Sequence, residues 1–340
     1  MLHKLKHILV LNIFLFLGLC THAQDLHFSQ FFNSPLTTNP ANTGFIPDAD
    51  YRLGVNYRNQ WSSILGAPYK TMSAFADAQL FKNKLENSWI GLGGVILSDK
   101  AGSGSLKSDK FYGSVAFHQM LGYSSLLSAG FNLGYVSKRI DPTNLKFPDQ
   151  FNGKFFDGTT PTSVQFNNLN IDYYDMQVGM NYAYFPDENT YINAGYSIHH
   201  VNKPKETFFG DNTSNGKIPI RHIGFVNAIL KVNPRVIINP NIYFTTQTNA
   251  IEINGGLNAN YNLSEFGESQ LIAGLYYRYK DAIIPMLGLE TKKLSVTLNY
   301  DITLSKLSKF NNFRGAAEIS IVKKGFYPSN VDKQTLCPKF

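Results

Sequence analysis

The sequence predicts an all-β protein, a transmembrane up-and-down antiparallel β-barrel of about 14 strands with a non-barrel N-terminal arm and C-terminal tail. The first observation is alternation: from Ile251 to Leu263, apolar residues alternate with Glu252 and a series of asparagines, and residues 294–302 repeat the pattern. Alternation over about ten residues fits a tilted strand that crosses a bilayer. Strands of soluble domains are usually about five or six residues long.

The second observation is an export signal at the start of the chain. Lys4 and Lys6 precede an apolar stretch at 8–19, and Thr21-His22-Ala23 follows it. These are the three parts of a signal peptide, and the apolar stretch is shorter than the roughly 20 residues that a spanning helix needs. We therefore expect a signal peptide at 1–23, cleavage near Ala23, and a mature protein in the outer membrane of a Gram-negative bacterium.

Alternation and turn residues together divide the rest of the chain into candidate strands. They are predicted at 51–61, 70–80, 89–98, 110–121, 124–140, 173–185, 191–201, 221–232, 235–247, 250–263, 269–279, 282–291, 294–302 and 316–323. An even number of strands suits a barrel whose two ends lie on the periplasmic side. The barrel is thus expected at 51–323.

The third observation is that the length of a predicted connection depends on whether it follows an odd-numbered or an even-numbered strand. The three longest, at 141–172, 202–220 and 99–109, all follow odd-numbered strands, whereas most connections after even strands are short and 81–88 is the longest of them. Short periplasmic turns and longer outer loops are typical of outer-membrane barrels. A soluble sandwich gives no reason for this sorting.

The alternation also predicts which side chains face lipid. Ile253 and Val296 are expected to face lipid, and Asn254 and Thr297 to face the lumen. On that basis an arginine replacing Ile253 costs about 2–4 kcal/mol near the membrane midplane, and an arginine replacing Asn254 much less.

The two ends of the mature chain do not resemble barrel strands. Segment 24–50 contains Pro35, Pro40 and Pro47, and proline removes a backbone donor from a sheet. We expect a periplasmic or lumenal arm at 24–50, either extended on the periplasmic side or folded into the lumen, and a similar tail at 324–340.

Composition narrows the function classes. The formal net charge of +7 is spread through turns without forming a block, so it gives no argument for nucleic-acid binding. Tyr and Phe are abundant, as the aromatic girdles of outer-membrane barrels require. Only Cys337 remains after processing, so no internal disulfide is possible.

The candidate phosphate-binding and metal-binding patterns lack the residue spacing that such sites need. The segment 101–107 has no glycine immediately before Lys107, as a phosphate-binding loop would need. His199 and His200 are adjacent and should point to opposite faces of a strand, which opposes a metal site shared with His222. A Ser197–His222 pair of a lipid hydrolase is conceivable but has no supporting motif. The sequence therefore predicts no catalytic, cofactor-binding or metal-binding residue.

Several short motifs occur in order along the mature chain. They are Phe28-Ser29-Gln30-Phe31, Asn39-Pro40-Ala41, Tyr57-Arg58-Asn59-Gln60-Trp61, Tyr300-Asp301, Glu318-Ile319-Ser320 and the closing Cys337-Pro338. Together they resemble the PorP/SprF family, outer-membrane proteins of the type IX secretion system of Bacteroidota. The resemblance spans the mature chain, and it marks candidate partner-contact or family-motif positions at Phe28, Gln30, Phe31, Asn39, Pro40, Arg58, Asn59, Gln60, Trp61 and Cys337.

The resemblance implies a non-enzymatic binding role without a cofactor. Its expected partners are the C-terminal signal domains of secreted cargo or surface adhesins, other type IX secretion components including periplasmic ring proteins, and outer-membrane lipid or lipopolysaccharide. Gliding motility is a further role that the family suggests. The alternative is a diffusion porin or hydrophobic-solute transporter, which the asparagine-rich predicted lumen would suit.

Overall fold

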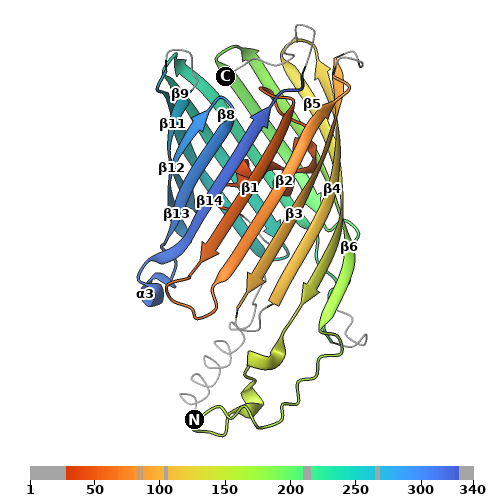
Figure 1. Ribbon diagram of the computed structural model, residues 1–340, viewed down its shortest axis with the longest axis vertical. Helices are drawn as coiled ribbons and strands as arrows, with labels where there is room; N and C mark the ends of the chain where they lie inside the picture. The colour runs from red at the N-terminus through yellow and green to blue at the C-terminus, as the bar shows by residue number, and fades with distance from the viewer. Residues whose placement is uncertain are drawn as a thin grey trace, which may run out of the picture.

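The computed structural model describes residues 28–82, 85, 87–102, 106–209, 216–264 and 269–328. In this part of the chain, fourteen antiparallel strands form a closed barrel in which each strand pairs with its sequence neighbours and the first pairs with the last (Figure 1). The predicted fold class is thus confirmed. The expected signal peptide, its cleavage site and Cys337 lie outside the described residues.

All fourteen predicted strands exist, most with ends within a few residues of those expected. They are β1 (Tyr51–Gln60), β2 (Tyr69–Leu80), β3 (Ser88–Ala101), β4 (Leu106–Leu121), β5 (Ser125–Arg139), β6 (Asn170–Asp187), β7 (Thr190–His199), β8 (Arg221–Asn233), β9 (Val236–Gln247), β10 (Ala250–Asn262), β11 (Ser269–Arg278), β12 (Ala282–Thr291), β13 (Leu294–Thr303) and β14 (Arg314–Gly325).

The two faces of the strands differ as the alternation predicted. Leu257 and Leu298 are 50% and 55% exposed on the outer surface, whereas Asn254 and Thr297 are 1% and 3% exposed inside the barrel. Hydrocarbon offers no partner for backbone amides, so closing the sheet satisfies the groups that an open edge would leave unpaired. The outer surface is therefore apolar and the lumen polar.

The barrel has one end with long connections and one with short turns. The longer connections emerge at the first end, which we call the outer end. They include 61–68, 140–169, the described parts 200–209 and 216–220 of the next, and 304–313 with the short helix α3 (Ser308–Asn311). The other, inner end has turns such as 188–189 and 292–293. The long connection expected at 99–109 is wrong, because β3 and β4 continue pairing as far as Ala101 and Leu106.

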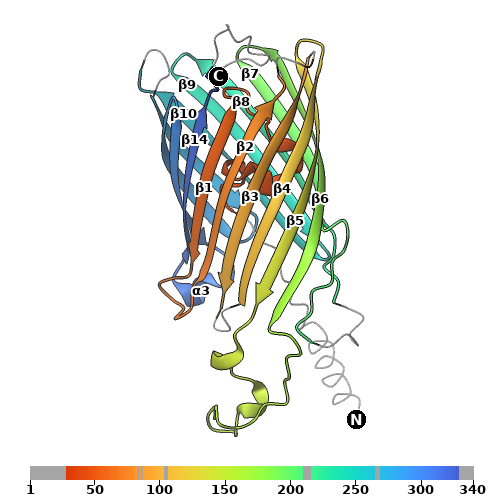
Figure 2. The ribbon, with the colours of Figure 1, turned by 45° about the vertical axis from the view of Figure 1, so that its right-hand side comes forward.

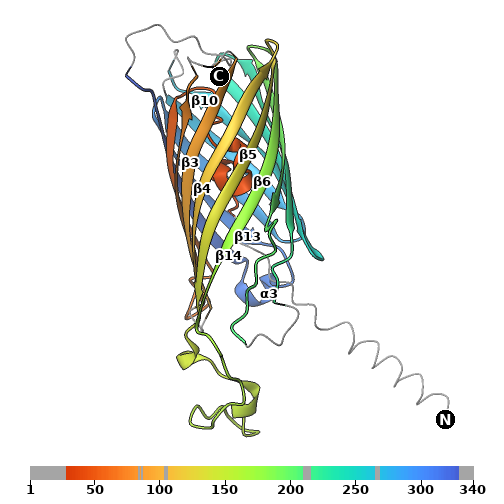
Figure 3. The ribbon, with the colours of Figure 1, turned by 90° about the vertical axis from the view of Figure 1, so that its right-hand side faces the viewer.

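The arm lies inside the barrel and takes no part in its wall (Figures 2 and 3). It forms three short helices, η1 (Phe31–Asn33), α2 (Pro35–Thr38) and η2 (Pro40–Asn42), before the chain enters β1. Leu36, Asn39 and Ala41 have no exposed surface. Of the two arrangements that the sequence left open for the arm, the structure shows the lumenal one for residues 28–50.

The histidine positions correct one expectation. His199 and His200 do not point to opposite faces: both are buried inside, because His200 has a φ of 58° and leaves the strand conformation. Ser197 Oγ donates to the Thr38 carbonyl oxygen, while His222 bonds the Tyr196 hydroxyl on the outer surface. Ser197 and His222 thus lie on opposite sides of the wall and form no catalytic pair.

None of the helices among the described residues has the length and apolar character of a membrane-spanning helix. In the same residues, no group of three or more His, Cys, Asp or Glu side chains is arranged to hold a metal ion.

Candidate functional site: the arm in the barrel lumen

Glycines in the wall allow the arm to approach the strand backbone. A Cβ added to Gly91 in β3 would overlap the Thr43 carbonyl, and one added to Gly179 in β6 would overlap the Asn39 side chain. A Cβ added to Gly130 in β5 would likewise overlap the backbone of Pro40. Glycine is commonly found where another chain segment must come this close. The wall is therefore shaped to fit the arm.

Asn39 connects the arm to the wall at its centre. Its Oδ1 accepts a hydrogen bond from Ala41 N at 2.9 Å and so caps η2, and its Nδ2 donates to the Met180 carbonyl of β6 at 2.8 Å. Pro40 then occupies the first helical position, where proline loses no backbone hydrogen bond. One fully buried side chain thus both starts a helix and holds it against β6.

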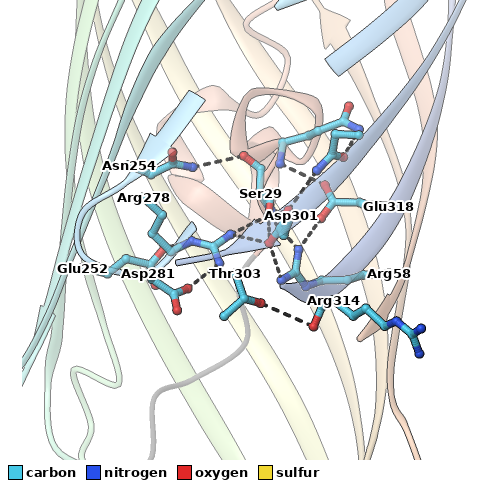
Figure 4. A network of polar contacts seen from close by, with 12 residues as sticks. Ser29, Arg58, Glu252, Asn254, Arg278, Asp281, Asp301, Thr303, Arg314 and Glu318 are labelled. Carbon is cyan, nitrogen blue, oxygen red and sulfur yellow. Dashed lines mark hydrogen bonds and ion pairs between the residues drawn. The ribbon is translucent and has the colours of Figure 1, made fainter. Parts of the chain in front are cut away.

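The start of the described arm is held by a charged cluster that we call the latch: Ser29, Arg58, Arg278, Asp301 and Glu318 (Figure 4). The Glu318 carboxylate accepts from the backbone N–H of Ser29 at 3.0 Å and of Gln30 at 2.9 Å. Ser29 Oγ lies 2.9 Å from both Asp301 carboxylate oxygens. The latch joins the arm to four strands, β1, β11, β13 and β14.

The charges of the latch are paired within the molecule. Arg58 contacts Asp301 at 2.8 Å and Glu318 at 3.1 Å, and Arg278 contacts Asp301 at 3.0 Å. Asp281 and Glu252 lie 3.0 and 3.6 Å from Arg278. Buried charges are tolerated when such partners surround them, and removing one partner leaves the other uncompensated. The latch therefore depends on all of its charges together.

Asn254 was expected to tolerate an arginine because it faces the lumen. Its position is as predicted, but its Nδ2 donates to the Ser29 carbonyl at 3.2 Å, and the lumen at this height is filled by the arm. An arginine there would displace Ser29 and add a third cation beside Arg58 and Arg278. These contacts replace the expectation of a mild effect with the prediction of a damaging one.

A second attachment, nearer the inner end, holds the last part of the arm. Asp77 of β2 accepts from Gly44 N at 2.8 Å and pairs with Arg52 at 2.7 Å. Trp89 Nε1 donates to the Gly44 carbonyl at 3.0 Å, and His118 Nε2 lies 2.8 Å from the Thr43 carbonyl oxygen. The arm is thus fixed at both ends of its lumenal course.

The structure brings most of the sequence-predicted site residues together in the lumen. Phe28, Gln30, Phe31, Asn39 and Arg58 are at most 5% exposed, and Pro40 is buried too. Phe31 stacks on Tyr243 of β9 with ring centroids 5.0 Å apart. These side chains face the molecule's own interior, so in this conformation they offer no surface to a partner.

The other predicted positions do not hold the arm. Gln60 and Trp61 line a cavity of about 380 Å³ at the outer end, next to the latch residues Arg58, Arg278 and Asp301. Asn59 is adjacent to Arg58 in β1, so its side chain points to the opposite, outer face of the barrel wall. Cys337 is outside the described residues. The predicted set therefore divides into an arm-holding group and a rim.

Sequence reasoning missed several charged residues of the site, among them Arg52 and Asp77 of the second attachment. Arg278 was not singled out, and Glu252 was noted only as a polar position of the alternating pattern, although both occupy lumen-facing positions near the outer ends of their strands. Asp301 and Glu318 were noticed only as motif residues. Several strands carry a charged residue at a position that the alternation assigns to the lumen, and this pattern could have indicated the site. Only the closed order of the strands shows that these residues meet.

The family comparison can now be read against this geometry. The family model described as type IX secretion system membrane protein PorP/SprF matches residues 20–322. The chain belongs to the PorP/SprF family. The Ser29, Arg58, Asp301 and Glu318 motifs that suggested the resemblance converge in the latch. Membership makes the protein an outer-membrane component of the type IX secretion system.

Solved structures resemble the fold. The Pseudomonas putida toluene transporter TodX is 14% identical with a TM-score of 0.54, over 87% of this chain and 95% of that one. The Ralstonia pickettii toluene transporter TbuX is 12% identical with a TM-score of 0.52, over 87% and 94%. At these identities the likeness concerns the barrel fold alone. No curated protein matches the sequence.

Proposed function

We propose that this barrel is a plugged binding component of the type IX secretion machinery, which holds cargo or adhesin C-terminal domains outside and contacts machine components in the periplasm. The observation that carries the proposal is the filled lumen: the arm is attached at the latch and at Asp77 and packs directly on wall glycines. A lumen built around its own chain suits an anchor better than a diffusion path.

The outer end supplies a surface for such a partner. Connection 140–169 extends beyond the barrel rim and ends in a small hairpin, where Asn152 N donates to Phe155 O at 3.2 Å. The Asn152 side chain accepts from the backbone N–H of Lys154 and Phe155, both at 3.0 Å. Phe155 and Phe156 are 60% and 47% exposed in this hairpin. Exposed aromatic side chains are typical of protein-binding surfaces.

Gene deletion with replacement by variants tests the proposal. We expect the deletion strain to lose one or more secreted proteins from its surface, and Phe155→Ser to reduce their display while the barrel level stays normal. Lys154→Ser, in the same hairpin, is the matched control. A deletion strain with an unchanged surface proteome would refute the proposed role. Gliding would be scored in the same strains.

A hydrophobic-solute channel is the second candidate, and the fold likeness to toluene transporters favours it. Planar-bilayer recordings separate the two functions. A plugged anchor shows no stable open channel, whereas a porin conducts. Toluene uptake that falls on deletion of the gene would support the channel.

A further inference from the structure

A second cavity, of about 330 Å³, lies in the lumen toward the inner end, on the other side of the arm from the latch. Its volume is at the lower end of the roughly 300–1,000 Å³ found for ligand sites. Phe32, Asn33 and Asp48 of the arm form part of its lining, and strands β7–β14 supply the rest. The charged lining residues pair with one another, because Lys324 lies 2.9 Å from Asp48 and 3.5 Å from Glu290. Nothing in the family assignment gives this cavity a role.

The cavity is lined by an unusual number of carboxamides. They are Asn33, Asn193, Asn227, Asn239, Asn241, Asn258, Asn260 and Gln270. Several occupy paired positions on neighbouring strands: Asn193 pairs with Asn227, Asn227 with Asn241, and Asn239 with Asn258. The carboxamides thus form a continuous ladder across β7–β11.

Some hydrogen-bonding groups of these carboxamides are paired with one another, and others have no partner. Asn239 donates to Asn260 at 3.1 Å, and Asn260 donates to Gln270 at 2.8 Å. The Oδ1 atoms of Asn193, Asn227 and Asn239, however, have no hydrogen-bond partner among the described residues. Buried acceptors without partners are costly and uncommon in folded proteins. Three of them belong to side chains that line this cavity, so a ligand with donor groups is a partner that would satisfy them.

The chemistry of the lining selects the class of ligand. A carboxamide offers one donor group and one acceptor without net charge, which is what a peptide group offers in return. Ile229, Ile237 and Ile272 add apolar surface for a side chain. The lining aromatic rings already stack on others, Phe32 on Tyr276 and Tyr191 on Phe185, which argues against a sugar platform.

We propose that this cavity binds a short, extended, uncharged segment of a polypeptide that enters from the periplasmic side. The proposal rests on the proposed function, since it gives the periplasmic contact a site. The bound segment would lie on the arm, because Asn33 lines the cavity and donates to Gln30 at 2.6 Å, one residue from Ser29 of the latch.

Site-specific photo-crosslinking in the native organism tests this site. A benzophenone amino acid replaces Gln270, which lines the cavity, or Ile238, which follows the opposite alternation phase from Asn239 on β9. We expect the probe at position 270 to give one protein adduct, mapped by mass spectrometry to a linear segment, and the probe at position 238 to give none. A synthetic peptide of that segment should compete for the adduct on the purified barrel.

The double variant Asn227→Leu/Asn239→Leu then removes two unpaired acceptors while keeping the number and branching of the side-chain heavy atoms. We expect at least a tenfold weaker adduct from position 270, and no change for Ile238→Leu. Heat-modifiable gel mobility establishes that each variant is folded; should the double variant not fold, Asn239→Leu alone is used. A saccharide adduct, no protein adduct, or an adduct unaffected by the leucines would overturn the inference. Surface display in the deletion strain tests the proposed function, and the crosslink at position 270 tests the cavity. Loss of display on deletion together with no adduct at position 270 would therefore overturn the cavity proposal alone.

Discussion

The two halves of the lumen use different chemistry on the two sides of the arm. The outer half holds the arm with full charges, and each latch charge has an opposite charge within about 3 Å. The cavity of the inner half is lined mainly by neutral carboxamides, three of which have an acceptor without a partner among the described residues, and its charged residues Asp48, Glu290 and Lys324 pair with one another. Charges in this lumen thus hold the protein's own arm, whereas the carboxamides of the inner cavity would bind the polypeptide segment proposed above.

Removing Asp301 is the strongest way to break this comparison. Asp301→Ala leaves Arg58 and Arg278 buried without their shared carboxylate, and we expect a loss of about 3–5 kcal/mol in the free energy of unfolding. Urea unfolding in lipid vesicles measures it, and protease digestion of the arm shows whether the arm is released. Asp281→Ala is the control, because Asp281 is 47% exposed and contacts Arg278 alone, so its loss costs about 1 kcal/mol or less. Equal losses would show that the latch is not a cooperative unit.

The outer surface provides the next largest effect. Leu257 lies in the middle of β10 and is 50% exposed to lipid, so Leu257→Arg should cost about 2–4 kcal/mol. Asn254→Arg, on the inner side of the same strand, should be at least as damaging because it disrupts the latch. Reversible folding into vesicles compares the two. A nearly harmless Asn254→Arg would mean that the arm can leave the lumen.

Leu257 and Asn254 also show which features of the structure the sequence could predict. Alternation alone correctly gave the strands and the direction of Asn254, because lipid enforces an apolar outer face along the whole barrel. It did not show what fills the lumen, since a polar inward residue suits water and an internal plug equally well. The convergence of Ser29, Arg58 and Asp301 depends on ring closure between residues more than 200 positions apart, which no local pattern contains.

A smaller effect tests whether the wall is fitted to the arm. In Gly179→Ala the new methyl group meets the Asn39 side chain, so we expect a loss of about 1–3 kcal/mol from overpacking. Gly113→Ala is the matched control, because the nearest atom to an added Cβ there is Leu133 O at 4.0 Å. Chemical unfolding of both variants gives the difference. If Gly179→Ala were as stable as Gly113→Ala, the arm would not be held tightly against β6.

The smallest effect concerns the charges at the rim of the inner cavity, where the contrast between the two halves is weakest. Burial alone would raise the pKa of Asp48, but the Lys324 ammonium, 2.9 Å from its carboxylate, outweighs this and lowers the pKa below its ordinary value of 3.8. A depressed carboxyl pKa contributes stability above pH 3.8, and that contribution is lost as the pH falls through the lower folded-state value.

Lys324→Met should therefore raise the pKa of Asp48, because burial then acts without the opposing cation. A carbon-13 NMR titration of aspartate-labelled protein in nanodiscs measures the shift. Lys323→Met is the control, since Lys323 is exposed on the other side of β14. An unchanged Asp48 titration in Lys324→Met would show that the rim charges are not paired in solution. In that case the inner half of the lumen would present free charges as well as amides to an incoming segment, and charged ligands would have to be tested beside neutral ones.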